Sequence, residues 1–269
     1  MKLTVLVDNN TYIDQYYCGE PAAAYYLEDG DSRILWDSGY SDIILHNAQG
    51  LGVDLGQLTD IAISHGHDDH TRGLLTLSGA YDLSAVTLTA HPLAFVPKQN
   101  DSGQPIGSPF SADELARRCR LQLSAEPVKL SPHITFLGQI PRVFPFEASA
   151  PIGQRQTKDG WTDDWLMDDT ALVCESPAGL YIITACSHSG ICNICHYAQA
   201  VTGQPRILGI LGGFHLFGIT PQLTATITYL KELGVTDLYP CHCVDFAARA
   251  FMAQTLPLTE VGVGLTLTW

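Results

Sequence analysis

The sequence predicts an α/β fold, and three observations support this prediction. Short apolar runs of about four to eight residues recur along the chain, as in buried strands. Several are followed by helical patterns with capping signals at their ends. Clusters of polar residues follow the strands instead of lying within them, as in α/β proteins whose sites lie at the carboxyl ends of strands. With 269 residues, 46% of them hydrophobic, the chain can bury a large core.

The first part of the chain alternates predicted strands with short helices. The acidic and glycine-containing turn at 28–31 joins the second and third strands. In order, we expect strands at 2–7, 22–27, 33–36, 57–63 and 86–90, a helix that starts at Asp42 and ends by Gly50 or Gly52, and a short helix at 73–78.

The composition changes between about residues 95 and 130, where prolines and glycines predict a loop. Ser111 and Glu114 have the spacing of a capping box, which predicts a helix continuing through Arg120. We interpret this segment as an insertion or lid within a single domain that spans residues 1–269.

The second part of the chain predicts a hairpin and then alternating helices and strands. Gly203 and Gly234 are expected to end two helices, and Thr220 with Pro221 to begin the second of them. In order, we expect strands at 134–137 and 143–146, a polar surface loop at 153–164, strands at 171–175 and 180–184, a helix at 191–201, a strand at 207–211, a helix at 220–233, a strand at 237–239, a helix at 246–254 and a final strand within 261–269.

The composition limits the classes of partner. The formal net charge is −14, and the 14 basic residues are scattered, so nucleic acid is not an expected partner. No run reaches the roughly 18 apolar residues of a membrane span, and Lys2 leads directly into a predicted strand instead of a signal peptide. We therefore expect a cytoplasmic protein, with no membrane partner, that acts on a small molecule; a homodimer is one option for its oligomeric state.

Eight cysteines are expected to be reduced thiols, as in other cytosolic proteins. The run from Cys192 to His196 matches a haem-attachment pattern, but it lies inside a predicted helix, so we reject that interpretation. Two interpretations stay open for Cys192, Cys195, Cys241 and Cys243: a tetrahedral sulfur site, or small buried side chains.

The stretch from Ser64 to Thr71 is the strongest functional signal. It follows the apolar residues 61–63 and places His65, His67, Asp69 and His70 within six positions. Borderline metals such as zinc bind this mixture of imidazole and carboxylate donors. If the chain changes from extended to helical within the stretch, its side chains reach two neighbouring points, so one segment can serve two metals.

Further polar residues follow other predicted strands. His188, His215 and His242 each come shortly after a strand, which indicates a composite site. His91 also follows a strand and either lines the pocket or caps a turn. Asp37 follows the strand at 33–36 and is either a support for the site or a cap for the next helix.

The pattern His65-x-His67-x-Asp69-His70 is similar to the signature of the metallo-β-lactamase superfamily, and the resemblance extends from residues 3–9 through 36–39 to 241–243. The segments 184–191, 212–216 and 239–243 resemble the branch named for 7,8-dihydropterin-6-methyl-4-(ribofuranosyl)aminobenzene-5′-phosphate synthase. The resemblance implies an αββα sandwich, in which two mixed β-sheets pack face to face with helices outside. It also implies that Asp37 lies beneath the metal centre and orients a ligand histidine.

On the basis of this resemblance, we hypothesise a dinuclear metal centre. His65, His67 and His188 would bind one metal, and Asp69, His70 and His242 a second. Zn²⁺ is the expected ion, with Mn²⁺ or Fe²⁺ as alternatives, and a metal-bound hydroxide would be the nucleophile. Asp69 would also orient that nucleophile, and His215 would act as a proton donor or oxyanion partner in preference to a metal ligand.

One feature departs from the superfamily. Most dinuclear members carry a bridging aspartate at the end of the second-half strand, but here that strand leads into Cys186, Ser187 and His188. Either His188 takes that role, or Asp168 or Asp169 reaches the metals. Without a bridging carboxylate we expect weaker binding of the second metal or a preference for a softer metal.

These observations predict a metal-dependent hydrolase or related transferase, phosphoesterase-like, for a small anionic substrate that is phosphorylated or pterin-like. The metals would supply the local positive charge, helped by Arg72, Lys98 or Arg142. The alternative is a non-catalytic, metal-dependent ligand sensor with the same fold.

Overall fold

The computed structural model describes residues 1–147 and 150–269. The internal contacts of the chain divide it into two compact units. Unit 1 comprises Met1–Ala125, Pro151–Asp168 and Gly262–Trp269, and unit 2 comprises Glu126–Ala150 and Asp169–Val261. Each unit has its own mixed sheet and its own hydrophobic core. Whether the two form one domain, as the sequence suggests, stays a prediction.

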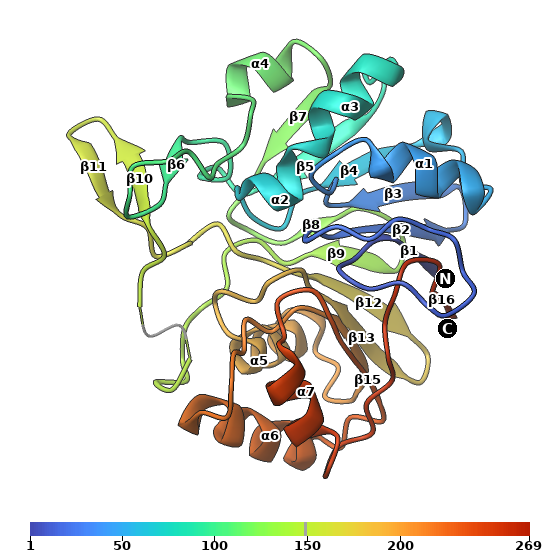
Figure 1. The fold of residues 1–269 in the computed structure, drawn as a ribbon, viewed down its shortest axis with the longest axis vertical. Coiled ribbons are helices and arrows are strands. Elements are labelled where there is room, and N and C mark those ends of the chain that lie inside the picture. The colour runs from blue at the N-terminus through green and yellow to red at the C-terminus, as the bar shows by residue number, and fades with distance from the viewer. Residues whose placement is uncertain (148–149) are drawn as a thin grey trace. The chain divides into compact units, whose positions relative to one another are not determined.

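Unit 1 contains a seven-stranded sheet (Figure 1). Strands β3, β4, β5 and β7 run parallel, whereas β16, β1 and β2 are joined in antiparallel pairs, and β2 is antiparallel to β3. The carboxyl ends of β3, β4 and β5 therefore lie along one edge. In sheet order the strands are β16 (Thr266–Thr268), β1 (Lys2–Val7), β2 (Ala24–Asp29), β3 (Ser32–Trp36), β4 (Asp60–Ala62), β5 (Thr87–Ala90) and β7 (Arg120–Leu123).

The helices of unit 1 pack against this sheet through apolar residues. Ile44, Leu74 and Leu115, from three different helices, belong to one core cluster with strand residues such as Ile61 and Leu88. Figure 1 shows these helices gathered on one side of the sheet. They are α1 (Ile43–Gly50), the short 3₁₀ helix η1 (Leu55–Gln57), α2 (Asp68–Thr71), α3 (Gly73–Ala80) and α4 (Ala112–Ala116).

A second, three-stranded sheet of unit 1 was not predicted. Strands β6 (Lys98–Gln99), β10 (Gln154–Thr157) and β11 (Gly160–Asp163) pair in the order β11-β10-β6 (Figure 1). The prediction of a loop at 153–164 is thus wrong. All four residues of β11 are exposed, so no alternation of apolar and polar side chains marks the strand in the sequence.

Unit 2 contains a six-stranded sheet. Strands β13, β14 and β15 are adjacent and parallel, so their carboxyl ends also share one edge, and the remaining strands pair antiparallel. In sheet order the strands are β15 (Asp237–Pro240), β14 (Ile207–Gly212), β13 (Gly179–Ile183), β12 (Leu172–Ser176), β9 (Ile134–Phe136) and β8 (Val128–Lys129).

In the described part of unit 2 there are three helices, α5 (Ile191–Thr202), α6 (Pro221–Leu233) and α7 (Phe246–Met252). The predicted caps are confirmed. Thr220 accepts a hydrogen bond from the Leu223 N–H at 3.1 Å, and Gly203 and Gly234 end α5 and α6 in the left-handed conformation. Apolar residues of all three helices share one core cluster with the strands. Among the described residues, no helix has both the length and the apolar character needed to cross a membrane.

Two further predictions of secondary structure are corrected. The Ser111–Glu114 capping box is confirmed, but α4 ends at Ala116, and Arg120–Leu123 instead forms β7. Residues 143–146 form no strand. The N–H groups of Val143 and Phe144 donate to the Asn193 side chain, and the Phe144 ring packs on other aromatic rings, so tertiary contacts replace a strand ladder there.

Candidate metal centre

Candidate metal-binding residues occur in each unit, one set in unit 1 and another in unit 2. In unit 1 the parallel strands β3, β4 and β5 lead into Asp37, the stretch beginning at Ser64, and His91. The chain bends at Ser64 and Gly66, His67 has an extended backbone, and α2 starts directly after it at Asp68. This change from extended to helical backbone, which the sequence predicted, gives the histidines and Asp69 their different directions.

His65 and His67 present their nitrogens to one point. The Nε2 atom of His65 lies 3.0 Å from Nδ1 of His67. Zn–N bonds of about 2.0–2.1 Å in tetrahedral geometry place two ligand nitrogens roughly 3.3 Å apart. Burial lowers the pKa of His67 to about 4, so its ring is neutral at pH 7, which is the form that binds metals. This pair fits a zinc ion.

His70 lies between two carboxylates. Its Nδ1 is 2.8 Å from Asp37 and its Nε2 is 3.2 Å from Asp69. Burial alone would lower the pKa of His70, but the two carboxylates outweigh it and raise the pKa well above its usual value. Binding a metal at Nε2 would therefore displace a proton.

Asp37 supports two of the histidines. Its carboxylate also accepts hydrogen bonds from the Ser64 N–H and hydroxyl, both at 2.7 Å, and the Ser64 hydroxyl is 2.9 Å from Nδ1 of His65. Both Asp37 and Ser64 are fully buried. Asp37 thus lies in contact with His70, and the role of His70 as a metal ligand stays a prediction. The alternative, that Asp37 caps the next helix, is wrong, because the N-cap residue of α1 is Asp42.

Gly66, between the two histidines, is held by Asp168. The Gly66 N–H donates to Asp168 at 2.8 Å, and the other Asp168 oxygen is 3.1 Å from the Lys98 ammonium, which also pairs with Asp164 at 2.6 Å. Burial would raise the pKa of Asp168, but Lys98 and the Gly66 N–H hold it below its usual value. A Cβ atom at Gly66 would lie 2.0 Å from the Ala94 carbonyl oxygen. Asp168 thus orders the backbone of the histidine motif.

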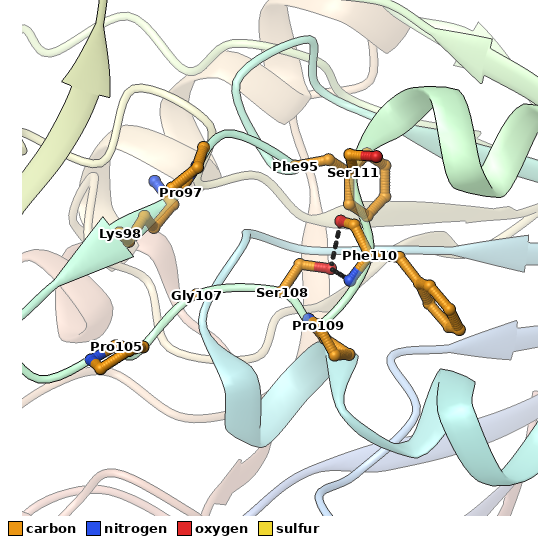
Figure 2. Close-up of a pocket in the computed structure, with 9 residues that line it drawn as sticks. All are labelled: Phe95, Pro97, Lys98, Pro105, Gly107, Ser108, Pro109, Phe110 and Ser111. Atoms are coloured by element: carbon orange, nitrogen blue, oxygen red, sulfur yellow. Dashed lines mark hydrogen bonds between the residues drawn. The ribbon is translucent and has the colours of Figure 1, made fainter.

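The predicted lid segment runs beside the motif. The Asp68 N–H donates to the Ile106 carbonyl at 2.9 Å, and His67 forms a β-bridge with Gly107. Beyond this contact the segment lines a pocket of about 270 Å³ (Figure 2). Phe95, Phe110 and three prolines dominate its wall, so the pocket is mainly apolar.

In unit 2 three histidines follow the carboxyl ends of neighbouring strands. His188, His215 and His242 come after β13, β14 and β15, as predicted. The rings of His188 and His215 lie 4.5 Å apart. Asp169 accepts hydrogen bonds from the backbone and hydroxyl of Ser189, so it orders the loop that carries His188.

A second group of donors in unit 2 combines sulfur and nitrogen. Donor atoms of Cys186, His242 and Cys243 all lie within 4.8 Å of one another. Cys192 and Cys195 instead lie in the hydrophobic core on α5. They belong to none of the close donor groups in the described part of the chain, so the hypothesis of a four-sulfur site is wrong.

Left-handed backbone conformations concentrate in these loops. Among the described residues, six that are not glycine have a positive φ, and four of them lie in the loops described above. Such conformations are held by surrounding contacts and cluster at functional sites. The four residues are Asp37, Ser187, His215 and His242.

Two of the three expected basic residues have identified partners, and one of them, Lys98, lines the pocket described above. Lys98 is only 2% exposed, because it pairs with Asp164 and Asp168, and the Arg72 guanidinium lies 4.8 Å from the centre of the Tyr40 ring. The backbone N–H of Leu93 donates to His91 at 3.2 Å, which fits the turn-capping interpretation. Two roles were not predicted from the sequence: the hydrogen bonds of Ser64 to Asp37 and His65, and the hydrogen bond of Asp168 to Gly66. For Ser64, its position directly before His65 was the one signal in the sequence.

Comparisons with known proteins agree with this fold and motif. The family model of the metallo-β-lactamase superfamily matches residues 19–163. An uncharacterized protein of Methanocaldococcus jannaschii is 31% identical over 255 residues, which are 94% of each chain. The 7,8-dihydropterin-6-methyl-4-(β-D-ribofuranosyl)-aminobenzene-5′-phosphate synthase of the same organism is 30% identical over 229 residues, covering 81% of this chain and 77% of that one.

A solved structure extends the similarity to the whole chain. The crystal structure of a metal-dependent hydrolase of the β-lactamase superfamily has a TM-score of 0.85 and 27% identity, covering 100% of this chain and 99% of that one. The predicted α/β fold of the metallo-β-lactamase type is thereby confirmed. The chain belongs to the metallo-β-lactamase superfamily and, within it, resembles the branch named for the dihydropterin synthase.

Proposed function

We propose that this protein is a metal-dependent hydrolase, or a related transferase, that acts on a small anionic substrate. The observation that carries the proposal is the buried pair of His65 and His67, whose facing nitrogens lie 3.0 Å apart. This spacing is close to the roughly 3.3 Å expected for two nitrogens bound to one zinc ion. The superfamily to which the chain belongs supplies the context in which such a site would support hydrolysis.

The proposed ligands come from both units. His65, His67 and His188 would hold one Zn²⁺, and Asp69, His70 and His242 a second, with Mn²⁺ or Fe²⁺ as alternative ions. Support comes from the topology of each unit, in which every ligand segment follows the carboxyl end of a parallel strand. When bound, the metals would lower the pKa of water toward about 7 and polarise the substrate oxygen under attack.

Two side chains are proposed to handle protons. Asp69 would accept a hydrogen bond from the attacking water and orient it, and its partly exposed carboxylate suits that contact. His215 would donate a proton to the leaving group or stabilise the developing oxyanion. Its placement on the loop after β14, with its ring against that of His188, supports this role.

The proposed substrate is phosphorylated or pterin-like. One relative is named for the synthesis of a pterin-containing phosphate, which makes this chemistry a candidate here. The charge of −14 and the burial of Lys98 argue against long polyanions, because a small ester can be neutralised by the metals alone. We include a cytoplasmic location in the proposal, since a reducing compartment suits the eight cysteines.

The test is turnover with defined metals. Metal-depleted protein would be assayed on bis-p-nitrophenyl phosphate, phosphomonoesters and lactones, before and after addition of Zn²⁺ or Mn²⁺. We expect metal-dependent hydrolysis that Asp69→Asn abolishes and Asp68→Asn, at the neighbouring acidic position, retains. Thermal stabilisation by ligands with no turnover of any ester would instead establish the sensor alternative.

A further inference from the structure

Unit 2 brings two cysteines and a histidine together. Cys186 lies in the loop after β13, whereas His242 and Cys243 follow β15, and β14 separates the two strands in the sheet. Their donor atoms nevertheless lie within 4.8 Å of one another. Loops from two strands converge on this point, and all three residues belong to one unit.

The loop after β14 is shaped around the sulfur of Cys243. The His215 N–H donates to this sulfur at 3.3 Å, and a Cβ atom at Gly213 would lie only 2.4 Å from it. Glycine at this position therefore leaves room for the sulfur. The same N–H could remain hydrogen-bonded to the sulfur if it bound a metal, as a supporting contact for the ligand.

The loop that carries Cys186 is held just as firmly. The Ser187 hydroxyl donates to the Gly213 carbonyl at 2.7 Å and lies 2.8 Å from the Thr184 hydroxyl. The Cys243 thiol lies 3.5 Å from the Cys186 carbonyl oxygen. These contacts fix the two sulfur-bearing segments against each other, which limits the reorganisation that a shared metal would require.

We infer that Cys186 and Cys243 bind a thiophilic divalent cation together with His242. The inference rests on the proposed function in one respect, the role of His242 as a ligand. It explains how a chain without the bridging carboxylate completes its centre: thiolates supply the missing negative charge. Each thiol would release its proton on binding. Sulfur ligands favour Zn²⁺ over Mn²⁺, which prefers oxygen donors.

Small buried cysteines are common in cores, and Cys192 and Cys195 show that arrangement on α5. Cys186 and Cys243 differ from them because they lie in loops, beside an imidazole, at the edge where strands end. The same edge carries the histidines of the candidate centre in unit 2.

X-ray absorption at the zinc edge tests this inference without any variant. Zinc-loaded protein should show sulfur scatterers at about 2.3 Å in addition to nitrogen and oxygen. Cys186→Ser and Cys243→Ser should each remove one sulfur from the shell, while Cys241→Ser, a matched change beside His242, should remove none. A shell of nitrogen and oxygen alone in the wild-type protein would overturn the inference.

Cadmium gives a second measurement on the wild-type protein, which avoids variants that fail to fold. Titration with Cd²⁺ should produce thiolate-to-metal charge-transfer absorption in the ultraviolet, and saturating Mn²⁺ should not prevent it. Stoichiometric Cd²⁺ binding without this absorption would refute thiolate ligation. If zinc has sulfur ligands but the protein has no hydrolase activity, only the proposed function is refuted. If the protein hydrolyses esters but its zinc has no sulfur ligands, only this inference is refuted.

Discussion

The carboxylate of Asp37 lies 2.8 Å from Nδ1 of His70, and both side chains are fully buried. A carboxylate at this distance keeps the proton on Nδ1, which would leave Nε2 available to the proposed metal. The same carboxylate accepts the Ser64 N–H. One aspartate therefore orients the ring of His70, a proposed ligand, and anchors Ser64 at the end of the strand that leads to the histidine motif.

Replacing Asp37 with asparagine should weaken metal binding more than folding. Asparagine keeps the shape but can place an N–H against the N–H of His70. Loss of such a supporting carboxylate typically lowers metal affinity by about 10–100-fold. Competition for Zn²⁺ against a chromophoric chelator would measure the change.

Asp82→Asn is the matched control, because Asp82 is exposed and accepts only a local hydrogen bond from the Ser84 N–H. Its Zn²⁺ affinity should equal that of the wild-type protein. Equal affinities for Asp37→Asn and wild type would show that Asp37 does not support the metal ligands.

The features predicted correctly from the sequence were those set by residues close together in the chain. The capping box at Ser111, the Thr220 cap and the glycines that end α5 and α6 depend on residues a few positions apart, so their physics is visible in the sequence. The histidine motif was equally visible, because its donors lie within six positions.

Contacts between distant segments could not be predicted this way. Asp168 reaches Gly66 across 102 positions, and no local pattern records that partner. Likewise, the helix that begins at Ser111 was expected to continue through Arg120, but α4 ends at Ala116 and Arg120 begins β7. The pairing of β7 with β5, a distant segment, is not visible in the local sequence.

Gly66→Ala should disrupt the motif. The added Cβ would lie 2.0 Å from the Ala94 carbonyl oxygen, so the backbone between His65 and His67 must shift. Overpacking of this kind costs about 1–3 kcal/mol. We expect a lower free energy of unfolding in urea and weaker Zn²⁺ binding.

Gly79→Ala provides the contrast. Gly79 lies in α3, is exposed, and its added Cβ would meet nothing within 4 Å. Alanine should stabilise the helix by about 0.5–1 kcal/mol and leave Zn²⁺ affinity unchanged. The free energy of unfolding should fall for Gly66→Ala and rise for Gly79→Ala. A Gly66→Ala protein more stable than the wild type would contradict the close approach of Gly66 to the Ala94 carbonyl oxygen.

Lys98→Met should destabilise the protein strongly. Lys98 is buried between Asp164 and Asp168, and its loss leaves two buried carboxylates without their cation. Removing one partner of a buried ion pair costs about 3–5 kcal/mol. Lys129→Met, which removes a half-exposed pair with Glu175, should cost at most about 1 kcal/mol. Similar decreases in the free energy of unfolding for both variants would show that the buried ion pairs of Lys98 stabilise the protein no more than an exposed pair does.

The Lys98 network also predicts an acid-sensitive stability. The pKa of Asp168 in the folded protein lies below its usual value, so the ionised form stabilises the native state. This contribution should be complete above the unfolded-state pKa of about 3.9 and be lost as the pH falls through the lower folded-state pKa. Urea unfolding of metal-free protein from pH 7 to about pH 2 should show the loss below about pH 4, and Asp168→Asn should remove this pH dependence. An unchanged pH dependence in that variant would assign the effect to other groups.

His188 and His215 lie with their rings 4.5 Å apart, yet their proposed roles differ, and substitutions can separate them. His188→Ala should lose one equivalent of bound zinc, because it removes a proposed ligand. His215→Asn should keep the full zinc content and lower kcat by about 100- to 10,000-fold, which is the usual contribution of a general acid. Zinc content by elemental analysis and kcat on the best ester substrate would be measured on the same preparations. His133→Asn, at an exposed position of unit 2, should leave both values unchanged. If His215→Asn loses zinc and His188→Ala retains it, the two roles are exchanged, and the ring after β14 is the ligand.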